Sequence, residues 1–138
     1  AGEASILMTM QEISTAVQYN LPIKIFILNN QYMGMVRQWQ ELLHEKNYSE
    51  SYSEALPDFV KLAEAYGCVG LRAESPDELD EKIQEMINID RPVIFDCHVD
   101  QAENCFPMIP SGKPHNQMLL GPKDQEENKI TGKGKALV

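Results

Sequence analysis

Two short runs of residues carry the chemistry needed to hold a metal ion and a phosphate. Gly2-Glu3-Ala4-Ser5 opens a predicted helix, and Asn29-Asn30 closes a predicted strand. Small residues at a helix start let backbone N–H groups approach a phosphate, and the helix dipole favours its negative charge. A carboxylate and an amide oxygen are hard ligands suited to Mg²⁺. If the strands that precede these two runs are neighbours, Glu3 and Asn30 come close in space.

Each run also has an ordinary structural explanation. An acidic residue in the first turn of a helix is common, because it interacts favourably with the helix dipole. An Asn-Asn pair is common in turns, because asparagine side chains bond to nearby backbone groups. Spacing and residue type by themselves therefore leave both readings open, a metal–phosphate site or a helix start and a turn.

The order of the predicted elements indicates how the two runs are positioned. Apolar periodicity predicts helices over residues 5–19, 33–44, from 57 or 58 to 66, and from 76 to 87, and strands over residues 23–28, 68–72 and 92–99. This alternation predicts an α/β fold, a parallel sheet with helices on both faces. Ligands gather at the carboxyl ends of such strands, where both runs lie.

Two helix ends carry specific local signals. Gly67 predicts the stop of the helix that ends at residue 66. Ser75 is predicted to cap the following helix, with Pro76 at its first position and Glu78 completing a capping box. The stripe that this helix is predicted to bury comprises Leu79, Ile83, Met86 and Ile87.

Composition and charge exclude several classes of function. A length of 138 residues, 43% hydrophobic and 24% charged, suits one globular domain. A net charge of -9 without a Lys/Arg-rich patch argues against nucleic acid as a partner. We find no apolar stretch long enough to span a bilayer and no secretory signal. The three cysteines, without a CxxC pair, predict free thiols. Because the chain opens on alanine and turn-like residues, we expect further sequence upstream.

Longer segments add a resemblance to a known family. The run from Gly2 to Asn30 resembles the thiamine-diphosphate motif, which begins Gly-Asp-Gly or Gly-Asp-Ala and ends Asn-Asn. The segments "STAVQYNLPIKIFILNNQYMGMVRQWQ", "PDFVKLAEAYG", "RPVIFDC" and "ENCFPMIPSGKPHNQML" resemble the large, catalytic subunit of acetolactate synthase (acetohydroxyacid synthase). The resemblance covers residues 1–121 and is specific, because "QYMGMVRQWQ" and "CFPMIPSGK" are not shared by thiamine enzymes at large.

The resemblance implies a domain organisation and an activity. Residues 1–100 would form the C-terminal part of a thiamine-diphosphate-binding domain truncated at its N-terminus, residues 101–121 a lid-like segment, and residues 122–138 a disordered tail. The whole protein would condense two pyruvates, or pyruvate with 2-ketobutyrate, with loss of CO₂, in branched-chain amino-acid biosynthesis. It would be a cytoplasmic bacterial transferase and a homo-oligomer, of a family whose members often have a small regulatory subunit, with FAD, if present, bound outside this chain.

The resemblance also implies which residues form the metal and diphosphate site. Glu3 matches the first Mg²⁺ ligand, Asn30 the ligand that binds through its side chain, and Tyr32 the position whose backbone carbonyl is the third ligand. The turn that would hold the diphosphate comprises Gly2, Ala4 and Ser5. None of these residues is a catalytic group in the sense of touching the reacting atoms.

A second group matches the mobile segment beside the cofactor. Gly34 and Met35 would contact the cofactor, and Met35, Val36 and Trp39 are similar to residues that line the substrate and herbicide channel. Trp39 has an alternative role in packing its helix, and methionine is a common gap-filler in protein cores.

Glu3 departs from the family, which has aspartate at this position. Glutamate is longer by one methylene, about 1.5 Å, whereas metal sites tolerate only about 0.2 Å in ligand distance. Three consequences are open: the backbone shifts, a water intervenes, or metal binding is weakened.

The resemblance further implies that this chain holds no catalytic residue. Thiamine enzymes activate the cofactor with a glutamate from a different domain, and no match to that domain is present. We therefore expect the chain alone to lack synthase activity. Two alternatives are kept, another thiamine-dependent decarboxylase or carboligase, and a non-catalytic interaction domain whose metal site Glu3 has spoiled.

Overall fold

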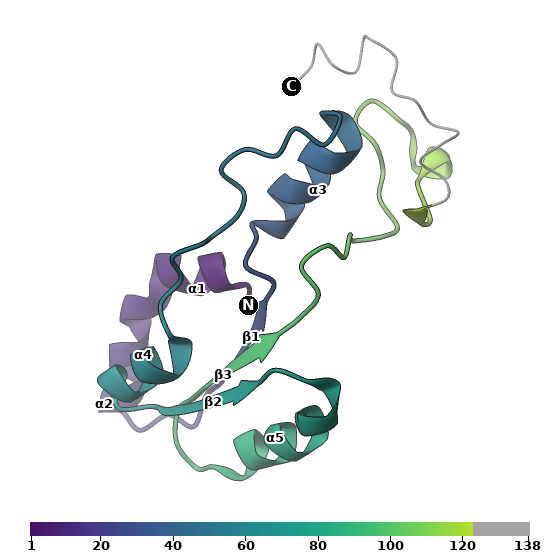
Figure 1. Cartoon of the computed structure of the whole chain (residues 1–138). Helices are drawn as coiled ribbons and strands as arrows, with labels where there is room; N and C mark the ends of the chain where they lie inside the picture. The colour runs from purple at the N-terminus through teal and green to yellow at the C-terminus, as the bar shows by residue number, and fades with distance from the viewer. Residues whose placement is uncertain (123–138) are drawn as a thin grey trace. The chain divides into compact units, whose positions relative to one another are not determined.

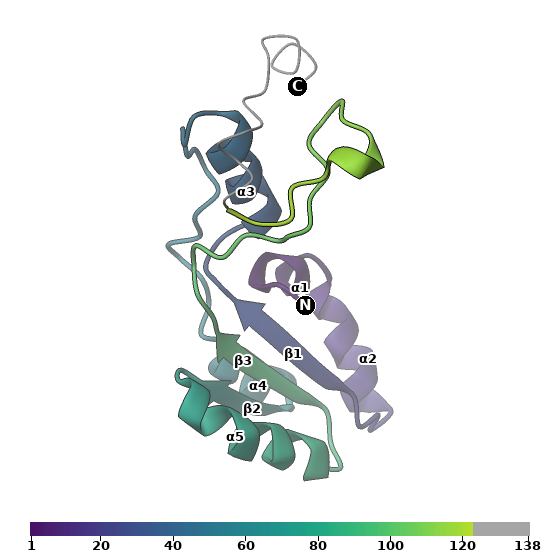
Figure 2. The same ribbon diagram turned by 90° about the vertical axis from the view of Figure 1, so that its right-hand side faces the viewer.

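A parallel sheet organises the part of the chain that the structure, a computed structural model, describes, namely residues 1–122. Its strands are β1 (Lys24–Asn29), β2 (Val69–Ala73) and β3 (Val93–His98), in the order β1-β3-β2. Figure 2 shows the arrows of β1 and β3 pointing the same way. A parallel bridge between Gly2 and Leu28 places the start of the chain beside the free edge of β1. The predicted α/β class with a parallel sheet is confirmed.

Helices cover both faces of this sheet, as predicted (Figure 1). The predicted helix over residues 5–19 begins two residues earlier and is divided into α1 (Glu3–Thr9), a 3₁₀ turn η1 (Met10–Glu12) and α2 (Ile13–Gln18). The other helices of this part are α4 (Phe59–Tyr66) and α5 (Pro76–Asn88). In Figure 1, α4 lies on the upper side of the strands and α5 on the lower side.

Each face of the sheet has its own core, because successive strand residues point to opposite faces. One cluster comprises Ile6, Ile13, Ile27, Phe59, Ala63, Cys68 and Ile94, from α1, α2, α4 and the strands. The other comprises Leu71, Ala73, Met86, Val93, Phe95 and Cys97, over α5. The central strand β3 is buried on both faces from Val93 to Cys97, which explains its nearly continuous apolar sequence.

The ends of α4 follow the local signals. Asp58 caps the helix, and its carboxylate accepts hydrogen bonds from the N–H groups of Val60 (3.0 Å) and Lys61 (3.3 Å). Gly67 ends it in the left-handed conformation, at φ 85°, which glycine adopts without steric cost. The predicted stop at Gly67 is confirmed.

Three details predicted for α5 are wrong, namely the Ser75 cap, the partner of Glu78 and the burial of Ile87. Ser75 occupies the N-cap position and Pro76 the first turn, but the Ser75 side chain makes no capping bond. Glu78 Oε2 instead accepts from the N–H of Glu74 at 3.0 Å, one residue before the expected partner. Ile87 is 56% exposed, because Met86 faces the sheet and the neighbouring position turns away from it.

Among the described residues, a second compact unit is formed by residues 34–52 together with residues 103–122, whereas residues 1–33 and 53–102 form the first. The second unit contains α3 (Gly34–Leu43) and η2 (His115–Gln117). Met108 and Leu119 exchange backbone hydrogen bonds of 2.9 and 2.7 Å as an antiparallel bridge. The segment predicted to be lid-like thus contains a backbone pairing of its own.

Residues 123–138, which make up nearly all of the predicted disordered tail, lie outside the described residues. Within residues 1–122, none of the helices is long and apolar enough to cross a membrane.

Candidate functional site

The Glu3 carboxylate is a buried acidic group at the carboxyl end of the sheet. Glu3 is the first residue of α1, follows the N-cap Gly2, and is only 1% exposed. Burial raises the pKa of Glu3, and hydrogen bonds from the backbone N–H groups of Glu3 itself, Asn30 and Tyr32 act in the opposite direction. Within the described residues, its Oε1 atom has no hydrogen-bond partner.

The turn after β1 supplies the groups beside this carboxylate. The Oδ1 atom of Asn30 accepts a hydrogen bond from the N–H of Tyr32 at 3.2 Å. Gln31 between them adopts a left-handed conformation, at φ 59°. Because the N–H groups of Asn30 and Tyr32 both act on Glu3, the structure brings together the three residues that the sequence predicted as metal ligands.

These residues fit a hard divalent cation. An unpartnered buried carboxylate oxygen costs free energy, and a cation would satisfy it. No group of three or more His, Cys, Asp or Glu side chains that could hold a metal ion occurs in residues 1–122. Mg²⁺ takes one or two carboxylates and completes its shell with waters and phosphate oxygens, which suits Glu3 with Asn30.

The predicted diphosphate turn lies at the same place. Gly2 has extended backbone angles (φ -86°, ψ 162°), Ala4 is half-buried and Ser5 is exposed. A Cβ atom on Gly2 would lie 3.7 Å from Ser5 Oγ, an ordinary contact. The protein itself therefore does not require glycine at position 2, and a requirement would have to come from a bound group.

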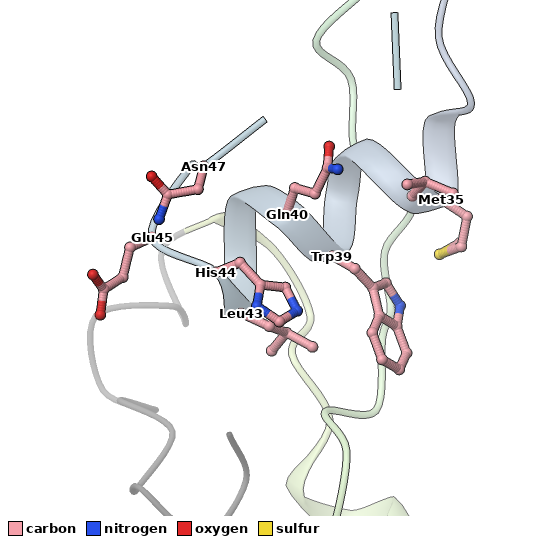
Figure 3. Close-up of a pocket in the computed structure, with 8 residues that line it drawn as sticks. Met35, Trp39, Gln40, Leu43, His44, Glu45 and Asn47 are labelled. Carbon is pink, nitrogen blue, oxygen red and sulfur yellow. The ribbon is translucent and has the colours of Figure 1, made fainter. Parts of the chain in front are cut away.

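The predicted channel residues belong to the second unit. Gly34 begins α3, and Met35 and Val36 are exposed on it at 53% and 45%. An open hollow of about 740 Å³ is lined by Met35, Val36, Trp39, Gln40, Leu43, His44, Glu45 and Asn47. Figure 3 shows Trp39, Leu43 and His44 projecting from one side of α3. The approach of this group to Glu3 and Asn30 stays a prediction.

Two polar residues in the middle of α3 make contacts that the sequence did not indicate. Gln38 is 1% exposed, and its side chain accepts from the N–H of Cys105 at 2.7 Å and donates to the Cys105 carbonyl at 3.0 Å. Arg37 forms an ion pair with Glu41 at 2.9 Å and donates to Asn104 at 3.0 Å. The bonds to Asn104 and Cys105 tie the helix that lines the hollow to the segment after residue 103 of the same unit.

A buried aspartate was also missed. Asp96 on β3 is 1% exposed and accepts from Asn29 Nδ2 at 2.9 Å, Arg72 Nε at 3.1 Å and, on the same oxygen as Arg72, His98 Nε2 at 3.3 Å. It also raises the pKa of Glu3, so the two carboxylates act on each other at one end of the sheet. The available signal was a single acidic residue inside the apolar run of residues 92–99.

Comparison with known families decides the affiliation of the chain. The family described as "Thiamine pyrophosphate enzyme, C-terminal TPP binding domain" matches residues 1–97. The chain belongs to this family. Thiamine pyrophosphate is another name for thiamine diphosphate. The family match therefore agrees with the fold and with the cofactor that the motif from Gly2 to Asn30 predicted.

Within this family, the chain is similar to the large subunits of acetolactate synthases. It is 45% identical to the acetolactate synthase large subunit of Haemophilus influenzae over 92% of its length, and 47% identical to that of Cyanidium caldarium over 86%. It is also 45% identical to the acetolactate synthase isozyme 3 large subunit of Escherichia coli over 86%. The predicted likeness to acetolactate synthase large subunits is confirmed.

The match also covers a limited part of each relative. The chain spans about a fifth of the length of these subunits, 20–22%. Among solved structures, it is similar to the thiamine diphosphate-dependent 4-hydroxybenzoylformate decarboxylase of Rhodococcus jostii, with a TM-score of 0.66 and 25% identity. That match covers 72% of this chain and 19% of the decarboxylase, and supports the thiamine-diphosphate-binding fold.

Proposed function

We propose that this chain is the metal–diphosphate half of the active site of an acetolactate synthase. The whole protein would join two pyruvates, or pyruvate and 2-ketobutyrate, with loss of CO₂, as a step of branched-chain amino-acid biosynthesis in the cytoplasm. One observation carries the proposal: a buried Glu3 oxygen without a partner among residues 1–122 lies beside the Asn30 turn, at the carboxyl end of β1.

Each residue of this half-site has a binding role. The Glu3 carboxylate, the Asn30 side-chain oxygen and the Tyr32 carbonyl would hold Mg²⁺, and the backbone of residues 2–5 would hold the diphosphate at the start of α1. Thiamine diphosphate supplies the carbanion chemistry when it is bound. The contribution of this chain is to fix and orient the diphosphate end.

The hollow on α3 would bind the substrate. Met35, Val36 and Trp39 offer apolar surface that suits the short alkyl group of a 2-keto acid, and Gly34 and Met35 would border the cofactor. The glutamate that activates the cofactor, any FAD, the homo-oligomer contacts and the small regulatory subunit would involve surfaces beyond those proposed for this chain.

Identity favours this function over a decarboxylase. The chain is 45–47% identical to three acetolactate synthase subunits but 25% identical to the aromatic 2-keto acid decarboxylase of similar fold. The two functions differ in substrate, so an assay with pyruvate and with benzoylformate separates them.

A chimera tests the proposal. The matching segment of the Escherichia coli isozyme 3 large subunit, to which the chain is 45% identical, is replaced by this chain. With thiamine diphosphate and Mg²⁺, we expect the chimera to form acetolactate from pyruvate and to leave benzoylformate unchanged. The 138-residue chain alone is expected to form none, because the activating glutamate would belong to a different domain.

The control chimera carries the matching Haemophilus influenzae segment and shows that the exchange itself preserves activity. If that control is active while our chimera is folded but inactive, the synthase proposal is wrong. Activity that appears only with Glu3→Asp would instead support the alternative of a spoiled metal site.

A further inference from the structure

A network of buried hydrogen bonds begins at Asp96 and has no role in the function proposed above. On the face of β3 that carries Ile94, Asp96 is a buried charged residue, and that face otherwise packs against the apolar side chains of α1 and α4. A buried carboxylate is costly unless it is hydrogen-bonded and paired. Here one of its oxygens faces Arg72 and His98, and the other faces Asn29.

The Asn29 side chain links Asp96 to the turn after β1 by hydrogen bonds at both ends of its amide group. Its Nδ2 atom donates to Asp96 Oδ1 at 2.9 Å, and its Oδ1 atom accepts from the N–H of Gln31 at 3.2 Å. Asn29 is 6% exposed, so water competes little for either bond. The carboxylate therefore fixes the orientation of the amide, because only one of the two amide orientations satisfies both neighbours.

The residue held in this way is the strained one of the turn. Gln31 has φ 59°, which a residue with a side chain rarely adopts. Its N–H is held by Asn29, and its carbonyl accepts from the N–H of Ser53 at 2.8 Å. Gln31 lies between Asn30 and Tyr32, so its conformation sets the directions of the Asn30 side chain and the Tyr32 carbonyl.

We propose that Asp96 is a positioning residue that, through Asn29, holds the Asn30–Tyr32 turn in the conformation needed to present two metal ligands. The role of the ligands rests on the proposed function. The holding of the turn does not, since none of the hydrogen bonds that link Asp96 to Gln31 involves a metal.

Amide hydrogen exchange of the ligand-free 138-residue chain tests the holding of the turn. In Asp96→Asn, the oxygen of the new amide pairs with the charged Arg72, so its NH₂ group meets the NH₂ group of Asn29. We expect the Gln31 N–H to exchange at least tenfold faster than in the original chain, after correction for the change at the core amide of Phe95. In the reciprocal double variant Asn29→Asp with Asp96→Asn, a donor again faces an acceptor, and the slow exchange should return.

Arg72→Gln is the matched control, because it removes another partner of Asp96 and leaves Asn29 in place. It should alter the Gln31 N–H no more than it alters Phe95. Equal acceleration in Arg72→Gln and Asp96→Asn, or unchanged exchange in Asp96→Asn, overturns the proposal. If Asp96→Asn does not fold, Asn29→Ala breaks the same link, and normal Gln31 exchange in that variant also overturns it.

Calorimetry of the chimera with Mg²⁺ and thiamine diphosphate tests the link to the metal. We expect Asp96→Asn to weaken Mg²⁺ binding about 10- to 100-fold, as loss of an orienting partner does in other metal sites. Unchanged affinity together with a loosened turn overturns the link to the metal. A chimera that binds no Mg²⁺ in any form refutes the proposed function, while the exchange result still decides the holding of the turn.

Discussion

Replacing Asn30 with alanine is expected to weaken Mg²⁺-dependent binding of thiamine diphosphate about 100-fold or more. The change removes the side-chain oxygen beside Glu3, and loss of even an indirect partner of a metal ligand lowers affinity about 10- to 100-fold. It also frees the N–H of Tyr32, which bonds to Asn30 Oδ1 at 3.2 Å. Isothermal titration of the chimera with Mg²⁺ and thiamine diphosphate measures the loss.

Two variants bracket this result. Asn30→Asp keeps an oxygen at the same place, so binding should fall less than tenfold, or about 1.4 kcal/mol. Asn88→Ala alters an exposed asparagine at the end of α5 and should change nothing. An Asn30→Ala chimera that binds the cofactor as tightly as the Asn88→Ala chimera would show that Asn30 is no ligand.

Replacing Glu3 with glutamine is expected to stabilise the metal-free chain at neutral pH and to abolish Mg²⁺ binding. Burial raises the pKa of Glu3 above the value of 4.5 that it has when unfolded. Its ionised form is therefore disfavoured in the folded state, and removing the charge should gain about 1–3 kcal/mol at pH 8. For a chain of this size that is roughly 3–10 °C in Tm.

The pH dependence has a defined sign. A raised folded-state pKa contributes stability that is present below pH 4.5 and is lost as the pH rises through the folded value. The Tm advantage of Glu3→Gln should thus be small near pH 4 and grow toward pH 8, as differential scanning calorimetry can follow. Glu54→Gln, at an exposed position, should show no such growth. An advantage of equal size at both pH values would contradict this explanation.

The sheet and its buried strands could be predicted because their signal is local. The strand ending at Asn29 and the strand around Phe95 are short apolar runs, and the structure places both within one or two residues of the predicted bounds. The closeness of Glu3 and Asn30 followed from assuming that the strands before them are neighbours, and the Gly2–Leu28 bridge places the residue before Glu3 beside β1.

The hydrogen-bond network could not be predicted, because its partners lie far apart in the sequence. Asn29 and Asp96 are separated by 67 positions, and so are Gln38 and Cys105. Periodicity shows which face of an element is apolar but not which polar side chain meets a given buried one. Periodicity also leaves the edge of an apolar face undefined, so Ile87 was assigned to a buried stripe that ends at Met86.

The most direct test of the half-site uses Mn²⁺, which accepts the same oxygen ligands as Mg²⁺ and broadens the NMR signals of nearby nuclei. The chain is titrated with Mn²⁺ in the presence of thiamine diphosphate. We expect selective broadening of the amide signals of residues 2–5 and 30–32, and loss of this broadening in Asn30→Ala. Broadening confined to the acidic surface of α5, around Asp77 and Asp80, or broadening without any selectivity, would contradict it.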